Sequence, residues 1–185
     1  NLTEFGQVRW LLAADFNGDG WLDLFISEIV GPRCFIFWGG PDGFSKERMT
    51  TLQTDGVASA AVADLNGNGY PDLILAQHMS TKKTVKQESY ITVYWGGADG
   101  YQENRKMQLP ASCANAVTVG DYRGCGQLDI YATSYNNGRC RDLLSYLYEN
   151  DHGNFSTMRV KYLFNHSGSG CVSGDFNGDG YTDLA

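Results

Sequence analysis

The stretch DFNGDGWLD, residues 15–23, sets an acidic, glycine-containing loop between two apolar runs, and it decides the fold because it repeats. It returns as DLNGNGYPD at residues 64–72, in altered form as DYRGCGQLD at 121–129, and as DFNGDGYTD at 175–183. The first aspartates of the four copies, at positions 15, 64, 121 and 175, are 49, 57 and 54 residues apart. Self-similarity at a period of about 50 residues is typical of repeat architectures.

Within one period the local signals are those of strands and turns. Residues 8–15 (VRWLLAAD) are apolar, residues 22–29 (LDLFISEI) partly alternate, residues 34–40 (CFIFWGG) end in a glycine turn, and residues 46–54 (KERMTTLQT) read as a more polar outer edge. A stacked β-helix needs shorter coils and a helical solenoid needs helices, which the pattern lacks. Four short antiparallel strands per period predict an all-β protein made of β-propeller blades.

We predict one repeat domain over residues 1–185, with approximate blades at 7–54, 55–110 and 111–164 and an incomplete blade at 165–185. Propellers typically have about four to eight blades, so we expect part of a larger propeller, or one that partner chains complete. The abrupt start at Asn1 and the stop within the pattern at Ala185 favour a mature or trimmed segment.

The acidic loop has the donor pattern of a cation site. Oxygen side chains stand at positions 1, 3, 5 and 9, glycine at position 6 permits a positive φ, and the carbonyl of position 7 can add a ligand. A loose cage of carboxylates and carbonyls suits Ca²⁺ better than Mg²⁺. The predicted calcium ligands are Asp15, Asn17, Asp19, Trp21 and Asp23, then Asp64, Asn66, Asn68, Tyr70 and Asp72, and finally Asp175, Asn177, Asp179, Tyr181 and Asp183.

The copies differ in ways that predict about three calcium sites rather than four. Asn68 replaces a carboxylate, so the second loop should bind more weakly. In the third loop Arg123 puts a cation where a ligand should be, so we expect no calcium at Asp121, with Arg123 pairing instead with Asp121 or Asp129. Two other interpretations are a plain turn, since Asp, Asn and Gly favour turns, and an EF-hand, which fails because position 12 is not Glu.

These motifs resemble the FG-GAP or VCBS repeat, the blade of integrin α-subunit propellers and of many secreted proteins. The resemblance rests on DFNGDGWLD, DLNGNGYPD and DFNGDGYTD and on the turn WGGPDGFS, and it covers essentially the whole chain. It implies a calcium-braced propeller whose acidic loop joins the innermost strand to the next, on the face away from the usual ligand side. Function in the family is diverse, so the resemblance bears more on fold and ion than on role.

Composition limits the partners and the cellular compartment that the protein can have. The net charge of −7 argues against a nucleic-acid surface, and no apolar run is long enough to span a membrane. Five cysteines favour an oxidising compartment, so we expect a secreted or cell-surface glycoprotein. Its candidate glycosylation sites are Asn1, Asn154 and Asn165. Its candidate disulfides are Cys113–Cys140 and Cys125–Cys171, which leave Cys34 unpaired.

Candidate ligand contacts cluster at the blade end opposite the acidic loops. An insertion at residues 77–89 carries Lys82, Lys83 and Lys86, and the matching turn of the third blade carries Tyr135, Arg139 and Arg141. Tyrosine and arginine are enriched at binding hot spots. These residues predict contact with an anionic glycan or a protein partner, the alternative being solvated loops.

The sequence favours a non-catalytic module for adhesion, recognition or assembly. Its three histidines lack metal-ligand spacing, and it contains no nucleophile-elbow, phosphate-loop or zinc-protease motif. Two alternatives stay open. One is the propeller portion of a secreted polysaccharide-degrading, lyase-like enzyme. The other is a protomer of an extracellular glycoprotein fibre.

Overall fold

The computed structural model describes residues 5–78 and 89–185. Apart from one short 3₁₀ turn, Lys46–Arg48, the regular elements in those ranges are strands. The first sheet comprises β1 (Gln7–Ala14), β2 (Asp23–Val30), β3 (Arg33–Phe37) and β4 (Met49–Gln53). The second comprises β5 (Val57–Ala63), β6 (Asp72–Gln77), β7 (Tyr90–Tyr94) and β8 (Lys106–Pro110). The third comprises β9 (Ala114–Gly120), β10 (Asp129–Ser134), β11 (Asp142–Tyr148) and β12 (Val160–His166).

Each of these sheets is antiparallel, with its strands side by side in chain order. A two-stranded fourth sheet, β13 (Ser173–Gly174) with β14 (Asp183–Leu184), follows. The prediction of an all-β protein with four antiparallel strands per blade is therefore confirmed for three sheets, and the described strands do not close into a ring. Asn1 and the lysines of the insertion, Lys82, Lys83 and Lys86, lie outside the described residues.

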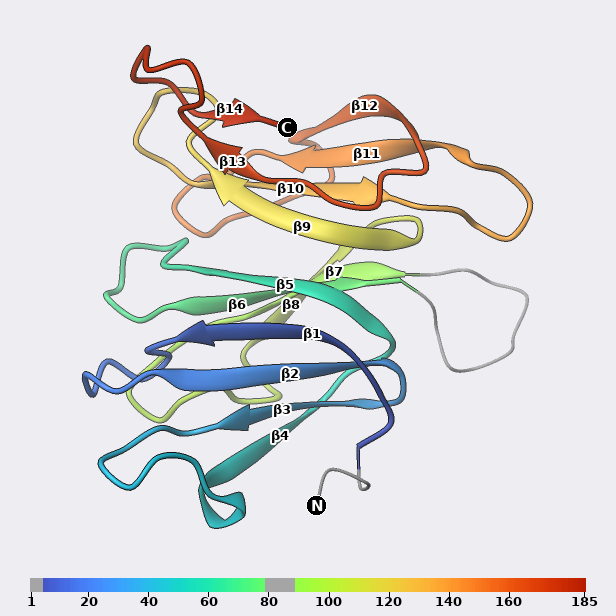
Figure 1. Ribbon diagram of the computed structural model, residues 1–185. Coiled ribbons are helices and arrows are strands. Elements are labelled where there is room, and N and C mark those ends of the chain that lie inside the picture. Colours follow the sequence, from blue (N-terminus) through green and yellow to red (C-terminus); the bar gives the residue numbers. More distant parts are fainter. Residues whose placement is uncertain (1–4, 79–88) are drawn as a thin grey trace.

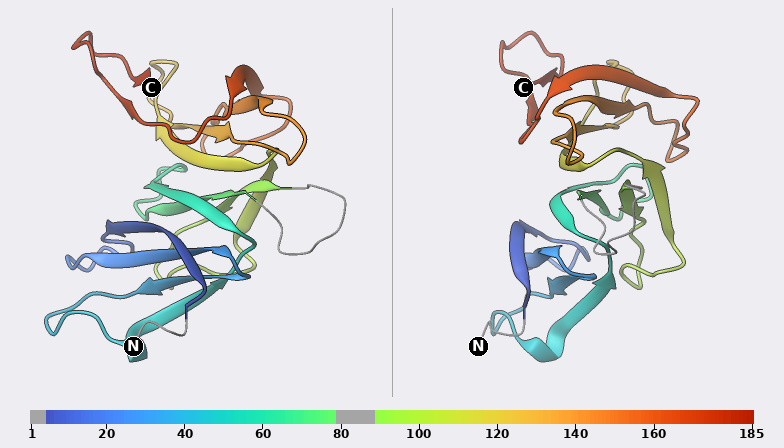
Figure 2. Two further views of the ribbon diagram at one scale, coloured as in Figure 1. Left: turned by 45° about the vertical axis from the view of Figure 1, so that its right-hand side comes forward. Right: turned by 90° about the vertical axis from the view of Figure 1, so that its right-hand side faces the viewer.

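The sheets stack face to face like neighbouring blades (Figure 1). The first strands of successive blades, β1, β5, β9 and β13, are neighbours, and hydrogen bonds join β9 to β5 and to β13. The Val117 N–H donates to Ser59 Oγ at 3.0 Å, and the hydroxyls of Thr118 and Ser173 are 2.8 Å apart. As a result the four acidic loops lie along one side of the stack, on the left in Figure 1 (see also Figure 2).

Alternation along β6 explains the two cores. Leu73 and Leu75 belong to the cluster shared with the first blade, whereas Ile74 and Ala76 belong to the cluster shared with the third. A strand buried on both faces reads as a continuous apolar run, as residues 73–76 (LILA) of β6 do in the sequence. Burying apolar area at about 25 cal/mol per Å² is what holds the blades together.

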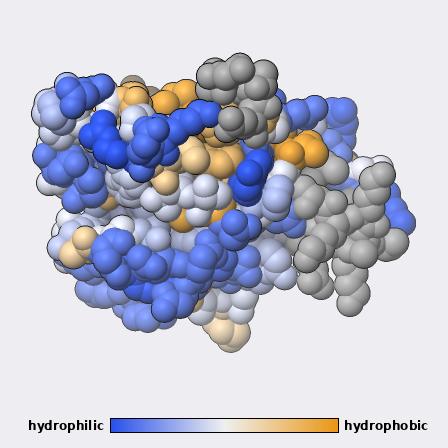
Figure 3. All heavy atoms as spheres, turned by 90° about the horizontal axis from the view of Figure 1, so that it is seen from below, coloured by the Kyte–Doolittle hydropathy of each residue, from blue (hydrophilic) through white to orange (hydrophobic). Residues whose placement is uncertain are grey.

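Among the described strands, no further four-stranded sheet packs on the outer faces of the first and third blades. On the first blade Ile26, Phe35 and Phe37 form a separate small cluster. Seen from that side, apolar residues appear between hydrophilic ones (Figure 3). On the third blade Tyr162 is 56% and Phe164 76% exposed. Among the described residues no helix is long and apolar enough to cross a membrane.

Candidate metal sites in the acidic loops

Two glycines shape each acidic loop. Position 6, predicted to need a positive φ, has φ of 87° at Gly20, 85° at Gly69 and 86° at Gly180. Position 4 also has a positive φ in all four loops, for example 74° at Gly18. The sequence carried the signal for this second glycine, because position 4 is Gly in every copy. Left-handed backbone at both positions lets the loop curl over its own side chains.

The first aspartate of each loop is held by backbone N–H groups. Asp15 Oδ1 accepts hydrogen bonds from Gly18 N at 2.7 Å and Asp19 N at 3.1 Å, and its Oδ2 accepts one from Gly20 N at 2.8 Å. Asp64 and Asp175 repeat this arrangement. The N–H groups of Gly180 and Gly178 hold the pKa of Asp175 below its ordinary value, so this carboxylate is charged at neutral pH.

Positions 3 and 5 lean into the same turn. In the first loop Asn17 Oδ1 accepts from Asp19 N at 3.0 Å, Asp19 Oδ1 accepts from Trp21 N at 2.9 Å, and Asn17 Nδ2 donates to Asp19 Oδ2 at 2.9 Å. The fourth loop has the same three bonds. In the second loop Asn68 Oδ1 accepts from Tyr70 N at 2.8 Å, so its amide holds the backbone as a carboxylate does.

Position 9 is buried and ties the loop to the next turn of its blade. Asp23 is fully buried; its Oδ2 accepts from Phe16 N at 2.8 Å and its Oδ1 from Gly39 N at 2.7 Å. Asp72 does the same with Leu65 N and Gly96 N. Burial raises the pKa of Asp72 to about 6, which means that its charged form is disfavoured and that a nearby cation would stabilise it.

The glycine of the WGG turn had no assigned role in the sequence analysis, and the structure supplies one. A Cβ at Gly39 would collide with the carbonyl oxygen of Leu22, and one at Gly96 with that of Pro71. Close approach of the two backbones is what lets the Gly39 and Gly96 N–H groups reach Asp23 and Asp72. The recurrence of WGG in phase with the acidic loop was the available signal.

The sequence analysis also assigned no role to an arginine that recurs once in each of the three blades. Arg48 donates to the carbonyl oxygens of Gly39 and Gly43, Arg105 to that of Gly100, and Arg159 to that of Asn154. Each guanidinium therefore closes the turn that follows the third strand of its blade. Their spacing of 57 and 54 residues matches the repeat.

The third loop replaces part of the oxygen set with a guanidinium. Arg123 makes a bidentate ion pair with Asp129, with Nε 2.9 Å from Oδ2 and a terminal nitrogen 2.8 Å from Oδ1. Asp129 is fully buried and also accepts from Asn150 N at 2.8 Å, as Asp23 does from Gly39. The predicted pairing of Arg123 is confirmed, and its partner is Asp129 rather than Asp121.

The donor chemistry of the first and fourth loops fits Ca²⁺. Each offers carboxylates at positions 1, 5 and 9 and an amide at position 3. Oδ1 of the first aspartate already accepts two N–H groups, whereas an oxygen that accepts one, such as Asp15 Oδ2, keeps a second lone pair. In residues 5–78 and 89–185 no three His, Cys, Asp or Glu side chains gather into a metal cluster. A calcium ion here would therefore need Asn17 or Asn177 and main-chain carbonyls as ligands as much as carboxylates.

The predicted ligand residues of the third blade do come together, at the end away from the acidic loops. The Arg141 guanidinium lies 5.7 Å from the ring centroid of Tyr135, which is 6.0 Å from that of His78. Arg139 and Arg141 line an open pocket of about 270 Å³ with Asn136. No carboxylate of the described residues forms an ion pair with either arginine.

The structure contains neither predicted disulfide, since all five cysteines are free thiols. Both the Cys113–Cys140 and the Cys125–Cys171 pairing stay predictions.

The two described sequons differ in accessibility, which predicts unequal glycosylation. Asn154 is exposed, whereas Asn165 Nδ2 donates to Ser134 O at 2.5 Å and packs beside Gly168. A glycan on Nδ2 of Asn165 would displace these contacts. In chain secreted from eukaryotic cells we expect glycopeptide mass spectrometry to find higher occupancy at Asn154, with Asn154→Gln removing most of the glycan. Occupancy at Asn165 equal to or above that at Asn154 would contradict this.

Comparison with known families matches residues 15–75 to the model of the FG-GAP-like repeat. A search of curated proteins found no match. The matched segment runs from the first acidic loop through the first blade and the second acidic loop into β6. It thus contains both loops, the WGG turn and the two strands whose aspartates anchor them. The chain therefore carries an FG-GAP-like repeat at residues 15–75, within a stack of β-propeller-like blades.

Proposed function

We propose that this chain is a calcium-braced β-propeller segment of a secreted or cell-surface protein, which acts in adhesion, recognition or assembly by binding a protein or glycan and performs no catalysis. The repeat and the blades give the architecture. The ion, the location and the role are the proposal.

The observation that carries the calcium part is the contrast between the third loop and the others. Asp129 is buried against the Arg123 guanidinium, whereas the equivalent Asp23 and Asp72 are equally buried with N–H partners only. A nearby positive charge stabilises a buried carboxylate. In the third loop the side chain of Arg123 supplies this positive charge. This supports a bound cation in the same role in the loops that lack an arginine.

Bound calcium would supply positive charge among the loop oxygens. The residues that would hold it are Asp15, Asn17, Asp19 and Asp23 in the first loop, and their equivalents in the second and fourth. The loop glycines and the backbone N–H bonds already orient these side chains. Because the position 9 aspartate also bonds to the WGG turn, fixing the loop fixes two connections of the same blade.

The end of the blades opposite the acidic loops supports the recognition part. Arg139 and Arg141 are exposed, lack ion-pair partners among the described residues, and share an open pocket. On a chain of net charge −7, two such cations on one turn favour a ligand with carboxylate or sulfate groups. The Asn137 side chain accepts from the N–H groups of Arg139 and Cys140, which holds the turn in shape.

Binding of dextran sulfate to the immobilised chain, with uncharged dextran as control, tests this function. We expect saturable binding to dextran sulfate in calcium, and a loss of at least about tenfold in affinity for Arg139→Ser/Arg141→Ser, since each charged contact contributes about 1.5–3 kcal/mol. The matched control is Lys161→Ser, an exposed cation outside the pocket whose partner Glu149 is not fully buried. Equal binding by all three proteins would refute the assignment of this turn, and eliminative cleavage of any polysaccharide would refute the non-catalytic part.

A further inference from the structure

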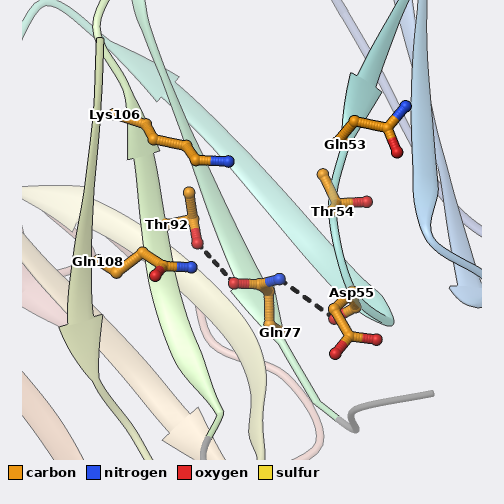
Figure 4. Close-up of a pocket in the computed structure, with 7 residues that line it drawn as sticks. All are labelled: Gln53, Thr54, Asp55, Gln77, Thr92, Lys106 and Gln108. Carbon is orange, nitrogen blue, oxygen red and sulfur yellow. Dashed lines mark hydrogen bonds between the residues drawn. The ribbon is translucent and has the colours of Figure 1, made fainter. Parts of the chain in front are cut away.

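A second cavity lies between the first and second blades. It has a volume of about 200 Å³ and is lined on one side by residues 53–55, which connect β4 to β5, and on the other by the face of the second blade. Figure 4 shows Lys106 and Gln108 reaching from β8 toward Gln77, with Thr54 and Asp55 across from them. Its lining is composed of amides, hydroxyls, one acid and one base.

The floor of this cavity is polar although it is buried. Gln77 is 6% and Thr92 3% exposed. The Thr92 hydroxyl donates to Gln77 Oε1 at 2.5 Å, and Gln77 Nε2 donates to the carbonyl oxygen of Asp55 at 3.2 Å. Burying polar groups is costly unless they are hydrogen-bonded. These two bonds fix the amide plane, and they leave Gln77 and Thr92 with further hydrogen-bonding capacity on the side of the cavity.

The next blade junction shows that the fold does not require this cavity. Tyr94 and Tyr148 are equivalent, since each donates its hydroxyl to the last carbonyl of the preceding outer strand, at Gln53 and Pro110. Two residues earlier stand Thr92 and Tyr146, and their register partners on the outer strands are Gln108 and Tyr162.

Aromatic rings occupy those positions at the second junction. Tyr146 and Tyr162 meet edge to face with centroids 5.6 Å apart, and the Tyr146 hydroxyl accepts from Ser112 N at 3.1 Å. At the first junction the same two positions carry Thr92 and Gln108, which are smaller and polar. The cavity therefore arises because Thr92 and Gln108 stand where the equivalent positions of the next blade carry tyrosines, on the same backbone arrangement.

We propose that this inter-blade cavity is a binding site for a neutral, hydroxyl-rich group, namely one pyranose residue of a glycan. Amide and hydroxyl side chains provide donors and acceptors side by side, as vicinal hydroxyls require. The one acid and one base of the lining, Asp55 and Lys106, give no net charge, and Lys106 is already paired with Glu103 at 2.7 Å. The volume lies below the ~300–1,000 Å³ of drug-sized sites, which suits a single ring.

This site is separate from the arginine pocket and does not depend on calcium. Saturation-transfer NMR on the full chain, with the methyl glycosides of glucose, galactose, mannose and N-acetylglucosamine as probes, tests it. We expect transfer to at least one probe, with millimolar affinity, both in calcium and in EDTA. No transfer to any of the four probes would overturn the proposal, whatever the outcome with dextran sulfate.

The repeat itself supplies the matched variant. Thr92→Tyr/Gln108→Tyr installs the pair that fills the next junction, and we expect it to abolish transfer while the chain stays folded. Should that variant not fold, Gln77→Met removes the amide at nearly constant volume and is expected to weaken binding at least about tenfold, the loss of one or two hydrogen bonds. Lys161→Ser, an exposed cation on β12 that lines neither pocket, is the control and should bind the glycoside unchanged. Transfer that persists in the filled or Met variant would place the sugar elsewhere.

Discussion

Removing calcium is expected to lower the melting temperature of this chain by roughly 5–10 °C through the first loop alone. A ligand at a hundred times its dissociation constant adds about 2.7 kcal/mol to the free energy of unfolding. For a chain of this size each kcal/mol corresponds to about 2–4 °C. The physical reason is that Asp15, Asp19 and Asp23 share one short loop, and without an ion their charges repel. The measurement is thermal unfolding followed by circular dichroism in excess Ca²⁺ and in EDTA.

The second loop provides the matched variant for this experiment. Asp19→Asn gives the first loop the position 5 residue that the second loop has naturally, and the Asn68 amide already makes the bond that Asp19 makes to the backbone. We expect this variant to keep its fold in EDTA and to need more calcium for the same melting temperature. Mg²⁺ at the same concentration should stabilise less, because it demands a tighter octahedral shell. A melting temperature that is the same in calcium and in EDTA would show that calcium does not stabilise the fold.

Sequence periodicity was sufficient to predict the blades because it occurs at two scales. The 49- to 57-residue repeat places the acidic loops, and alternation within each period places the strands. The pairing of Arg123 was predictable for the same reason. The other three loops share one oxygen pattern, so the arginine in the third loop is recognisable as a substitution. Charge alone left two partners open, and burial of Asp129 decides between them.

The remaining features depend on contacts between segments whose distance the sequence does not encode. Gly39 matters because two backbones approach each other, and the motif alone does not say which carbonyl lies opposite. The cavity between the first two blades requires the register of Thr92 with Gln108 and the packing of one blade on the next. Each case needs tertiary register, which strand patterns leave undetermined.

Loss of Arg123 is expected to be the most destabilising single surface-loop change in the third blade. Arg123→Met leaves Asp129, which is fully buried, with the Asn150 N–H as a donor but with no cation. Removing one partner of a buried ion pair costs about 3–5 kcal/mol, which corresponds to roughly 6–20 °C in melting temperature. The guanidinium also bonds to the carbonyl oxygen of Asn150 at 2.6 Å, and the side chain of Asn150 donates to Leu65 O in the second blade at 2.7 Å. The damage should therefore extend to the junction of the two blades, and it should be the same in calcium and in EDTA.

The decisive form of this experiment exchanges the guanidinium for an ion. Arg123→Asn/Cys125→Asp changes DYRGCGQLD into DYNGDGQLD, with the oxygen pattern of the first and fourth loops and the same positive φ at Gly124 and Gly126. In EDTA this variant should be about as unstable as Arg123→Met, because Asp129 again lacks a cation. In calcium it should recover most of the lost melting temperature, and isothermal titration should count one more bound ion than in the unchanged chain. If calcium does not raise the melting temperature of this variant, an ion cannot replace the arginine as the positive charge beside Asp129. The contrast between the third loop and the others would then no longer support bound calcium.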